Sequence, residues 1–392
     1  MFRELAYKVQ TTLGRIHPQR ALNLPPASGS SPRGRALVSY LPLPLIGDPG
    51  LFRGHSNIWE CSEIVGILNR LGYAVDLINW QDSSFVPDRE YDVVFDIHRN
   101  LLRYAGEKTI RIFHVTGSHP DFSNLAEQQR LEALRERRGV WLQQRRGVES
   151  DDVRLFSENL EAADMITLIG NEITAATFPA SIRTKIRRCN ATGSFTSRLS
   201  GLPTDGQRNE FLWLNGAGAV HKGLDLVLEF FARNPQLTLH VVGPYAKEHD
   251  FVAAYHHELT MCPNIHKHGF LFPGSVRFRK IVARVRAFVN PTCSEGISTS
   301  SITCMQYGLI PILSRQAGIT LPSGMGRILE NCTPEQLEQA VLDLAGRKPR
   351  EVEVMSRSVR EYAQSTYSRT VFSSLMEQAL TTALSGCHGA EL

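Results

Sequence analysis

The chain has 392 residues, more than twice what a single core of about 150 residues needs, so two domains are expected. Hydrophobic residues make up 42% of the sequence and charged residues 21%, which excludes disorder over most of the chain. The net charge is only +4, and no stretch reaches the roughly 18 to 20 continuous apolar residues of a membrane-spanning helix. We therefore expect a globular protein of the cytoplasm.

Charge and cysteine usage exclude two further classes of protein. Residues 1–35 contain six basic residues and one acidic residue, so the rest of the chain is close to neutral. It lacks the excess of basic residues that is typical of a nucleic-acid-binding surface. The 7 cysteines are scattered and form no C-x-x-C pair, which excludes a disulfide framework and a structural zinc site. We expect no nucleic-acid partner and reduced thiols.

The amino-terminal segment differs from the rest of the chain. Residues 1–20 place apolar side chains at helical spacing, with basic residues elsewhere on the helical wheel. This pattern is typical of a surface helix packed on the protein, the commoner case, and also of an interfacial helix on anionic lipid, which would give peripheral membrane contact. Residues 21–35 are rich in Pro, Ser and Gly and predict a linker, so 1–35 is expected to precede the first domain.

From residue 36 onward, short apolar runs alternate with amphipathic stretches. The runs are apolar on both faces, as buried strands of a parallel sheet require, so 36–205 is predicted to be a Rossmann-like domain. Its expected strands are 36–46, 73–80, 91–98, 109–117 and 165–170, and its expected helices are 58–72 and 125–144. Ligands bind at the carboxyl ends of such strands, where Asp96, His98, His114 and Ser118 are expected to lie.

A second alternation follows the aperiodic stretch 196–209 and predicts another Rossmann-like domain over 206–350. Two doubly wound α/β domains in tandem would face a central cleft, which is the default binding site. Residues 351–392 are predicted to be helical and to pack back on the first domain. The expected strands are 211–216, 237–243, 264–270, 287–296 and 309–315, and the expected helices are 225–233, 276–285, 300–308, 334–346 and 353–380.

Four stretches of this second half are distinctive. They read GAGAVHKGLDLVLEFF, LHVVGPY, VNPTCSEGISTS and MQYGLIPILS, and they lie between residues 216 and 314. In order and spacing they resemble the carboxy-terminal half of the GT-B glycosyltransferases, in particular the retaining, family 4-like enzymes with two glutamates separated by seven residues. The amino-terminal half is similar to that family only in layout. The resemblance implies transfer of a sugar from a nucleotide-sugar donor to a hydroxyl of a glycan, lipid-linked or protein acceptor.

Lys222 is the candidate cation for the leaving diphosphate. Negative charge grows on that group as it departs, so the site needs a cation and backbone N–H donors aimed at it. Lys222 precedes a glycine at the start of a predicted helix, where its ammonium and the helix amino terminus would face the same phosphates. A solvated lysine at a helix start is the alternative.

Glu295 is the candidate residue for the donor sugar. It follows a predicted strand and precedes Gly296, Ile297, Ser298 and Thr299 at the head of the next helix. A glutamate there can accept hydrogen bonds from sugar hydroxyls, while free N–H groups and hydroxyls meet phosphate and the glycine permits close approach. By the resemblance Glu295 is the first of the paired glutamates, and a simple helix cap is the alternative.

Two positions depart from the family pattern. Thr303 stands where the second glutamate would bind the ribose, so a charge-assisted bond of about 1.5 to 3 kcal/mol would fall to about 1. Asn215, Gly216, Ala217 and Gly218 stand where an arginine is often found, and we expect these small residues to cradle phosphate instead. The departures favour, as an alternative function, a non-catalytic sugar- or nucleotide-binding partner subunit.

The resemblance assigns the remaining site residues. It places Gly243 and Gly269 in the donor pocket, with 269–274 around the base, and it places His114 beside the reacting sugar. A structural histidine is the alternative for His114, and Asp96, His98 and His119 compete for its role.

A cluster of histidines at 256–268 is not expected to bind metal. Its neighbouring members would point to different faces of a helix, and paired cysteines are missing. GT-B enzymes as a class also stabilise the diphosphate without a metal ion. No cofactor is therefore expected.

Overall fold

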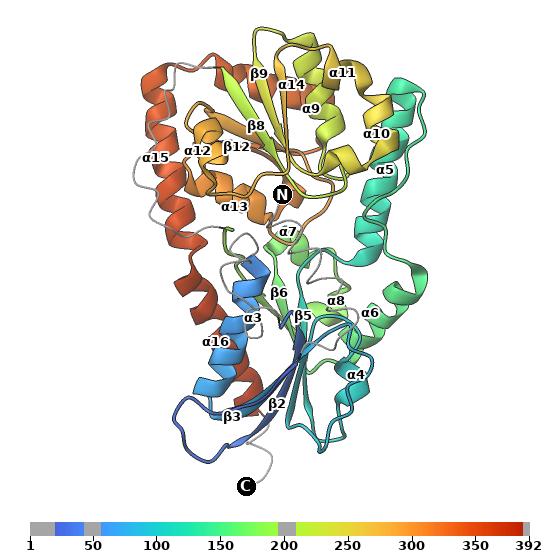
Figure 1. Ribbon diagram of the computed structural model, residues 1–392, viewed down its shortest axis with the longest axis vertical. Coiled ribbons are helices and arrows are strands. Elements are labelled where there is room, and N and C mark those ends of the chain that lie inside the picture. The colour runs from blue at the N-terminus through green and yellow to red at the C-terminus, as the bar shows by residue number, and fades with distance from the viewer. Residues whose placement is uncertain (1–19, 43–55, 195–208, 387–392) are drawn as a thin grey trace.

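The computed structural model describes residues 20–42, 56–194 and 209–386, and these form two α/β domains stacked along the long axis of the molecule (Figure 1). The predicted amphipathic segment before residue 20 and most of the predicted interdomain connection lie outside these ranges. Within them, no helix is long and apolar enough to cross a bilayer.

The first domain is a seven-stranded sheet in the order β1-β3-β2-β4-β5-β6-β7, parallel throughout except at β1. Its strands are β1 (Arg20–Leu24), β2 (Gly34–Tyr40), β3 (Tyr73–Asn79), β4 (Val93–Asp96), β5 (Ile110–Val115), β6 (Met165–Ile169) and β7 (Ile186–Cys189). Its helices are α3 (Ser56–Arg70), α4 (Leu101–Tyr104), α5 (Pro120–Arg138), α6 (Ser150–Ala162), α7 (Glu172–Ala175) and α8 (Ala180–Arg183).

Strand β1 corrects the prediction that 21–35 is only a linker. It pairs antiparallel with β3, with Ala21 opposite Leu77. Arg20 anchors it further, because its Nε donates to Asp82 Oδ2 at 2.6 Å. Strand β1 has only five residues and is followed by two prolines. A segment of this length is too short for its hydrophobic pattern to distinguish a strand from a linker. A shortened protein starting near residue 31 would therefore lose an edge strand.

The second domain is a six-stranded parallel sheet in the order β10-β9-β8-β11-β12-β13, which is the 3-2-1-4-5-6 order of a doubly wound fold. Its strands are β8 (Glu210–Leu214), β9 (Thr238–Val242), β10 (Ile265–Gly269), β11 (Ala287–Asn290), β12 (Ile310–Ser314) and β13 (Arg327–Leu329). Its helices are α9 (Leu224–Arg233), α10 (His249–Ala254), α11 (His256–Thr260), α12 (Val276–Val282), α13 (Thr299–Gln306) and α14 (Pro334–Ala345). The predicted fold class, two doubly wound domains, is confirmed.

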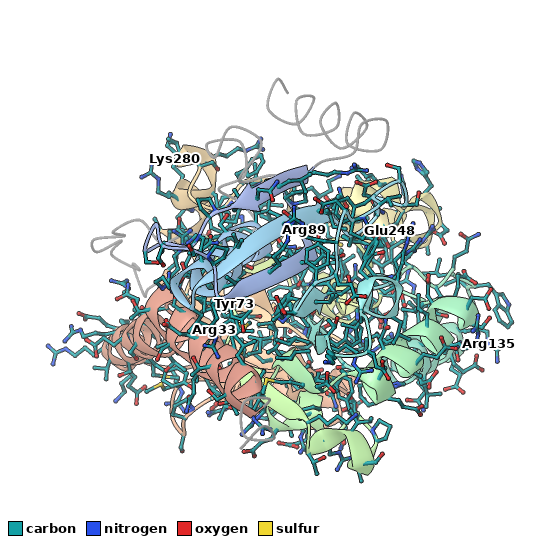
Figure 2. All side chains as sticks on the ribbon, turned by 90° about the horizontal axis from the view of Figure 1, so that it is seen from below. Arg33, Tyr73, Arg89, Arg135, Glu248 and Lys280 are labelled. Atoms are coloured by element: carbon teal, nitrogen blue, oxygen red, sulfur yellow. The ribbon has the colours of Figure 1, made fainter. Side chains whose placement is uncertain are left out.

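The cores lie between the sheets and the helices that cover both of their faces. All five residues of β8 and of β12 are buried, as expected for strands packed on both sides. Side chains fill the space around the strands, whereas Arg135 of α5 and Lys280 of α12 lie at the periphery (Figure 2). The apolar runs in the sequence therefore correctly predict that these strands are buried on both faces.

The carboxy-terminal helices span both domains. The sequence suggests one long helix over 353–380, but the structure has α15 (Pro349–Thr366) and α16 (Arg369–Gly386), separated at residues 367 and 368. Helix α15 packs on α13 and β12 of the second domain, whereas α16 packs on α3 and β7 of the first. The pair runs along one side of the molecule and ties the two domains together (Figure 1).

Candidate active site

The site lies where the two sheets present their topological switch points. In doubly wound sheets ligands bind at the carboxyl ends of the strands where the strand order reverses, here between β2 and β4 and between β8 and β11. A cavity of about 440 Å³ is lined by residues from all four of these ends: Tyr40, Ile97, Asn215 and Glu295. The predicted cleft between the domains is thus a real cavity.

A cavity of similar volume, about 460 Å³, lies between α5 and residues 330–334. Its two buried or half-buried arginines already have a carboxylate partner, because Arg137 Nη2 is 2.9 Å and Arg130 Nη1 3.8 Å from Asp225. The cavity at the switch points is therefore the candidate site.

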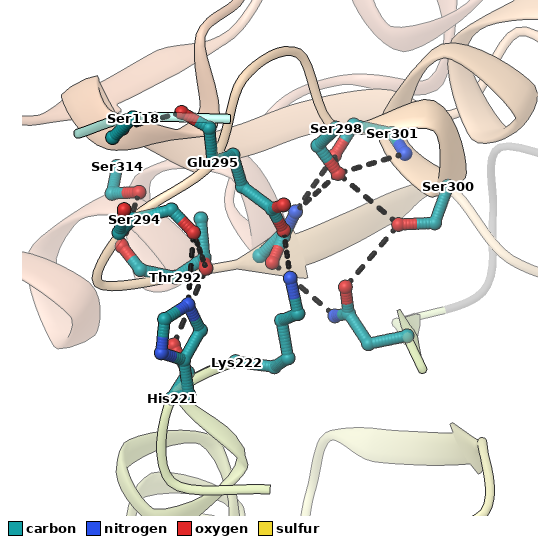
Figure 3. A network of polar contacts seen from close by, with 12 residues as sticks. Ser118, His221, Lys222, Thr292, Ser294, Glu295, Ser298, Ser300, Ser301 and Ser314 are labelled. Atoms are coloured by element: carbon teal, nitrogen blue, oxygen red, sulfur yellow. Dashed lines mark hydrogen bonds and ion pairs between the residues drawn. The ribbon is translucent and has the colours of Figure 1, made fainter. Parts of the chain in front are cut away.

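Lys222 and Glu295 form an ion pair inside the cavity. The ammonium donates to Glu295 Oε1, and Figure 3 shows the two side chains reaching toward each other across the loop before α13. Lys222 is only 6% exposed. Burial raises the pKa of Glu295, but the charge of Lys222 and its hydrogen bond outweigh burial and hold that pKa below its ordinary value. Glu295 is therefore a charged carboxylate at neutral pH.

The backbone around Lys222 fixes the position of its side chain. Gly223 caps α9 in the left-handed region at φ +71°, and a Cβ there would lie 2.5 Å from Pro291 O. The indole of Trp213 donates to Lys222 O at 3.0 Å. Lys222 therefore lies just before the start of a helix, where the sequence predicts it.

The first domain holds the loop that carries Glu295. Ser118 Oγ donates to Glu295 O at 2.7 Å, and Thr174 Oγ1 donates to Gly296 O at 2.9 Å. A Cβ on Gly296 would lie 2.4 Å from the carbonyl oxygens of Thr116 and Ile169, so only glycine fits at this contact. The carboxylate belongs to one domain but is positioned by the other.

The amino terminus of α13 completes the polar wall of the cavity. Ser298 caps the helix and accepts from Asn290 Nδ2 at 2.9 Å, while Ser300 Oγ donates to Asn215 Oδ1 at 3.2 Å (Figure 3). The N–H groups of Thr299 and Ser300 have no acceptor among the described residues, and both residues line the cavity. Free N–H groups at a helix start attract anions, so this wall can bind phosphate beside Lys222.

Of the other predicted donor-binding residues, some line the cavity and others do not. Gly216 and Ile297 line it. Gly218, Gly243 and Gly269 do not; Gly218 N donates to Glu248 Oε1 at 2.8 Å, and Gly243 N donates to Gly269 O at 2.9 Å. The amide of Gly218 is therefore already engaged.

Thr303 lies behind the cavity wall. Its hydroxyl donates to Thr299 O at 2.8 Å and accepts from Ser194 N at 2.9 Å, and the residue is 1% exposed. The hydroxyl holds the end of the first domain to α13. Its assignment to the donor ribose stays a prediction.

His114 is buried next to the cavity but does not line it. The side chain is 1% exposed, its Nδ1 lies 2.8 Å from Thr167 Oγ1, and its ring packs against Tyr40 and Phe95. Burial lowers its pKa to about 3, so the imidazole is neutral. Its catalytic role stays a prediction, and Thr116, two residues further along, is the residue that reaches the cavity.

Two residues that compete with His114 for the role beside the reacting sugar make contacts that stabilise the fold. Asp96 is fully buried and accepts the N–H groups of His98, Asn100 and Leu101 at 3.0, 2.8 and 3.1 Å. His119 accepts from Asp121 N and caps α5. Neither lines the cavity.

Glu60 is a cavity residue that the sequence reading missed. It lies on α3, is 3% exposed, and accepts hydrogen bonds from the side chain of Ser56 and, at 3.4 Å each, from the amide and hydroxyl of Thr192. Burial raises its pKa to about 7, which suits a group that exchanges protons near neutrality. The available signal was a glutamate on the apolar face of a predicted helix.

Replacing Glu60 with glutamine is expected to increase stability at alkaline pH. The folded pKa of about 7 exceeds the ordinary value of 4.5, so the native state holds the proton more tightly and wild-type stability falls as pH rises between these values. Glutamine does not ionise, so the advantage of the variant should grow to about 3 kcal/mol above pH 7. Urea unfolding at pH 5 and pH 8 measures it, with Glu63→Gln on the same helix as control. A difference in the free energy of unfolding between variant and wild type that does not change with pH would show that burial does not raise the pKa of Glu60.

Comparison with known proteins identifies the second domain. Residues 209–347 match the family of glycosyl transferases group 1. This match runs from the start of β8 through α14 and contains Lys222, Glu295 and α13. No curated protein sequence is significantly similar to the chain.

Solved structures of glycosyltransferases share the fold. Sucrose-phosphate synthase from Thermosynechococcus elongatus is 13% identical, with 90% of this chain and 99% of that chain covered and a TM-score of 0.61. HepE from Anabaena in complex with UDP and glucose is 10% identical over 90% and 99%, with a TM-score of 0.58. TarM is 12% identical over 75% of this chain, with a TM-score of 0.53, and the chain spans only 54% of its length. At these identities the likeness concerns the fold, and the predicted GT-B fold is confirmed.

Proposed function

We propose that the chain is a glycosyltransferase that moves a sugar from a nucleotide-sugar donor to a hydroxyl acceptor. The observation that carries the proposal is the buried Lys222–Glu295 pair beside the free N–H groups of α13, in a cleft between two doubly wound domains. The pair lies in the segment that matches the glycosyl transferases. UDP-sugar recognition by a protein of this fold is exemplified by HepE, whose structure contains UDP-glucose.

The two charges divide the work between the two parts of the donor. The ammonium of Lys222 and the N–H groups of Thr299 and Ser300 are arranged to meet the diphosphate, whose charge grows as it leaves. Glu295 is arranged to accept hydrogen bonds from the sugar. In the free protein the two side chains bind each other. The donor therefore has to separate them, with its diphosphate binding Lys222 and its sugar binding Glu295. The charges of Lys222 and Glu295 thus balance each other until the donor arrives.

We further propose that transfer retains the configuration of the sugar, with the leaving phosphate accepting the proton of the incoming hydroxyl. A retaining double displacement would instead need a carboxylate nucleophile from the first domain. Of the first-domain residues that the structure describes, Glu60 is the one that contributes a carboxyl group to the cavity lining, and with a pKa of about 7 it is partly protonated at neutral pH. The anomeric configuration of the product, observed by NMR at early times, tests retention.

Thermal shift with nucleoside diphosphates and nucleotide-sugars tests the proposed function. A ligand at 100 times its Kd stabilises the native state by about 2.7 kcal/mol, so binding of UDP, GDP or ADP would be evident. Turnover of the sugar form of the binding nucleotide with glycan, lipid-linked or protein acceptors would confirm transfer. Absence of any binding would contradict the proposal, whereas binding without turnover would favour the partner-subunit alternative.

Activity is expected to survive EDTA. Lys222 and the α13 amides supply the positive charge that a metal ion would otherwise provide to the leaving group. Among the described residues, no group of three or more His, Cys, Asp or Glu side chains could hold a metal ion. Initial rates with and without chelator measure the effect. Loss of activity that manganese or magnesium restores would overturn a metal-independent mechanism.

A peripheral membrane contact through residues 1–20 stays a proposal, since all but the last of these residues lie outside the described ranges. A truncation that tests it with anionic vesicles should begin at Arg20, because β1 belongs to the sheet of the first domain.

A further inference from the structure

Arg146 of the first domain lines the cavity beside the donor machinery of the second. It lies in the segment between α5 and α6, and the same cavity is lined by Lys222, Glu295 and Ser300. Its guanidinium has no carboxylate partner in the described part of the chain. The other arginines of this basic region each have an acidic partner, and the pairs are Arg135–Glu132, Arg137–Asp225, Arg138–Glu258 and Arg145–Asp250. Arg146 is thus set apart from its neighbours by both position and pairing.

The side chain of Arg146 lies directly against the loop before Lys222. A Cβ on Gly218 would be 2.8 Å from Arg146 Cγ, and Gly218 has φ +92°, so this contact depends on glycine. The charge of Arg146 also reaches Glu295, where it adds to that of Lys222 in lowering the carboxyl pKa against the effect of burial. The guanidinium is therefore within electrostatic range of the ion pair.

Glu127 of α5 fixes the backbone of this segment. It is 1% exposed, and its carboxylate accepts the N–H groups of Arg145 and Arg146 at 3.0 Å each. The same carboxylate lies 3.6 Å from His221 Nδ1, next to Lys222 in sequence. One buried carboxylate thus ties the arginine segment of the first domain to the lysine loop of the second.

The charge balance of the cavity creates a need for this arginine. A nucleoside diphosphate brings at least two negative charges, whereas Lys222 and Glu295 together are neutral and Asn215, at the end of β8, is uncharged. Among the described residues, Lys222 and Arg146 are the cationic side chains that line the cavity. A guanidinium can donate two parallel hydrogen bonds to phosphate oxygens.

We propose that Arg146 is a second diphosphate-binding residue, which clamps the donor from the first domain opposite Lys222. This inference rests on the proposed function, because it assigns a further contact to the same donor. Donor binding then uses cations from both domains and stabilises the closed arrangement of the cleft.

Calorimetry on the full-length protein tests the clamp. The probes are inorganic pyrophosphate, the nucleoside diphosphate that binds best among UDP, GDP and ADP, and the matching nucleoside. Arg146→Ala should weaken the binding of pyrophosphate and of the nucleoside diphosphate by about 10- to 100-fold and leave the binding of the nucleoside unchanged. Arg146→Lys should give an intermediate loss, since lysine keeps the charge but not the paired donors. Arg145→Ala, which removes a neighbouring charge outside the cavity, should stay within about twofold of wild type.

The possible results separate this inference from the proposed function. If the wild-type protein binds no nucleoside diphosphate, both fall together. If the wild type binds but Arg146→Ala binds the diphosphate equally well, the clamp is wrong and the proposed function stands. Equal losses of affinity for nucleoside and diphosphate would also overturn the clamp, because they indicate a change in the shape of the site. A similar loss in Arg145→Ala would overturn it as well, because it indicates an effect of overall positive charge and not of a contact made by Arg146.

Discussion

Replacing Glu295 with glutamine is expected to lower the turnover of sugar transfer by at least about a hundredfold, while binding of the nucleoside diphosphate stays the same or becomes tighter. The proposed role of Glu295 is to hold the sugar, so its loss removes transition-state stabilisation. The variant also frees Lys222 from a charged partner, so the diphosphate no longer competes with a carboxylate for the ammonium. Steady-state kinetics with the identified donor and calorimetry with the diphosphate measure the two effects separately.

Glutamine is the better replacement here, because alanine would leave a buried ammonium without an acceptor and destabilise the fold. Glu353→Gln on the exposed side of α15 is a matched control, since its carboxylate also pairs with a basic side chain, that of Arg357 one turn away. Wild-type turnover in Glu295→Gln would contradict the assignment of the sugar site. A large loss of diphosphate binding would contradict the division of roles between Glu295 and Lys222.

Replacing Lys222 with methionine is expected to weaken diphosphate binding by about 10- to 150-fold, the equivalent of a charge-assisted hydrogen bond, with little effect on the bare nucleoside. Methionine keeps the length of the side chain and removes its charge. The same change should raise the pKa of Glu295, because burial remains and the main opposing charge is gone. The free variant should therefore lose stability relative to wild type, increasingly as pH rises through that new pKa.

Calorimetry with diphosphate and nucleoside, and unfolding at several pH values, test these two consequences. Lys280→Met on the outer face of α12 is the control, since that lysine lies at the periphery (Figure 2). If Lys222→Met weakens nucleoside and diphosphate equally, the ammonium does not meet phosphate. If its stability follows that of wild type at every pH, the ion pair does not set the ionisation of Glu295.

The fold and the placement of Lys222 and Glu295 before helices could be predicted from the sequence because both depend on local patterns, whereas the ion pair between the two residues was not predicted. Buried strands appear as apolar runs, and Lys222 and Glu295 each stand at a strand–loop–helix boundary that is visible in a short stretch. His114 shows the limit of this reasoning. Its place at a strand end is evident from the sequence, but whether the ring points into the cavity or into the core depends on packing against Tyr40 and Phe95.

The missed residues depend on contacts between the domains. Glu60 differs from other glutamates locally only by its place on the apolar face of a helix, and Arg146 is one of several arginines in a basic stretch. They become site residues only because the first domain faces the second across the cavity. Thr174 is a similar case, since its hydroxyl positions the Glu295 loop from more than 100 residues away in sequence.

The two places where the chain passes between the domains lie next to each other, and this determines how the cleft can open. The first passage begins after Ser194, and the second is the α15–α16 junction; Asn190 Nδ2 donates to Thr366 O at 2.9 Å between them. A protein joined at one edge rotates about that edge. The opposite edge is closed by contacts of α5 and the segment after it with the second domain: Leu134 is buried in that domain's core, and Arg145 pairs with Asp250 of α10 (Figure 1). Rotation about the hinge would have to break these contacts, so an interdomain label pair near α5 and α10 would show whether donor binding opens or closes this edge.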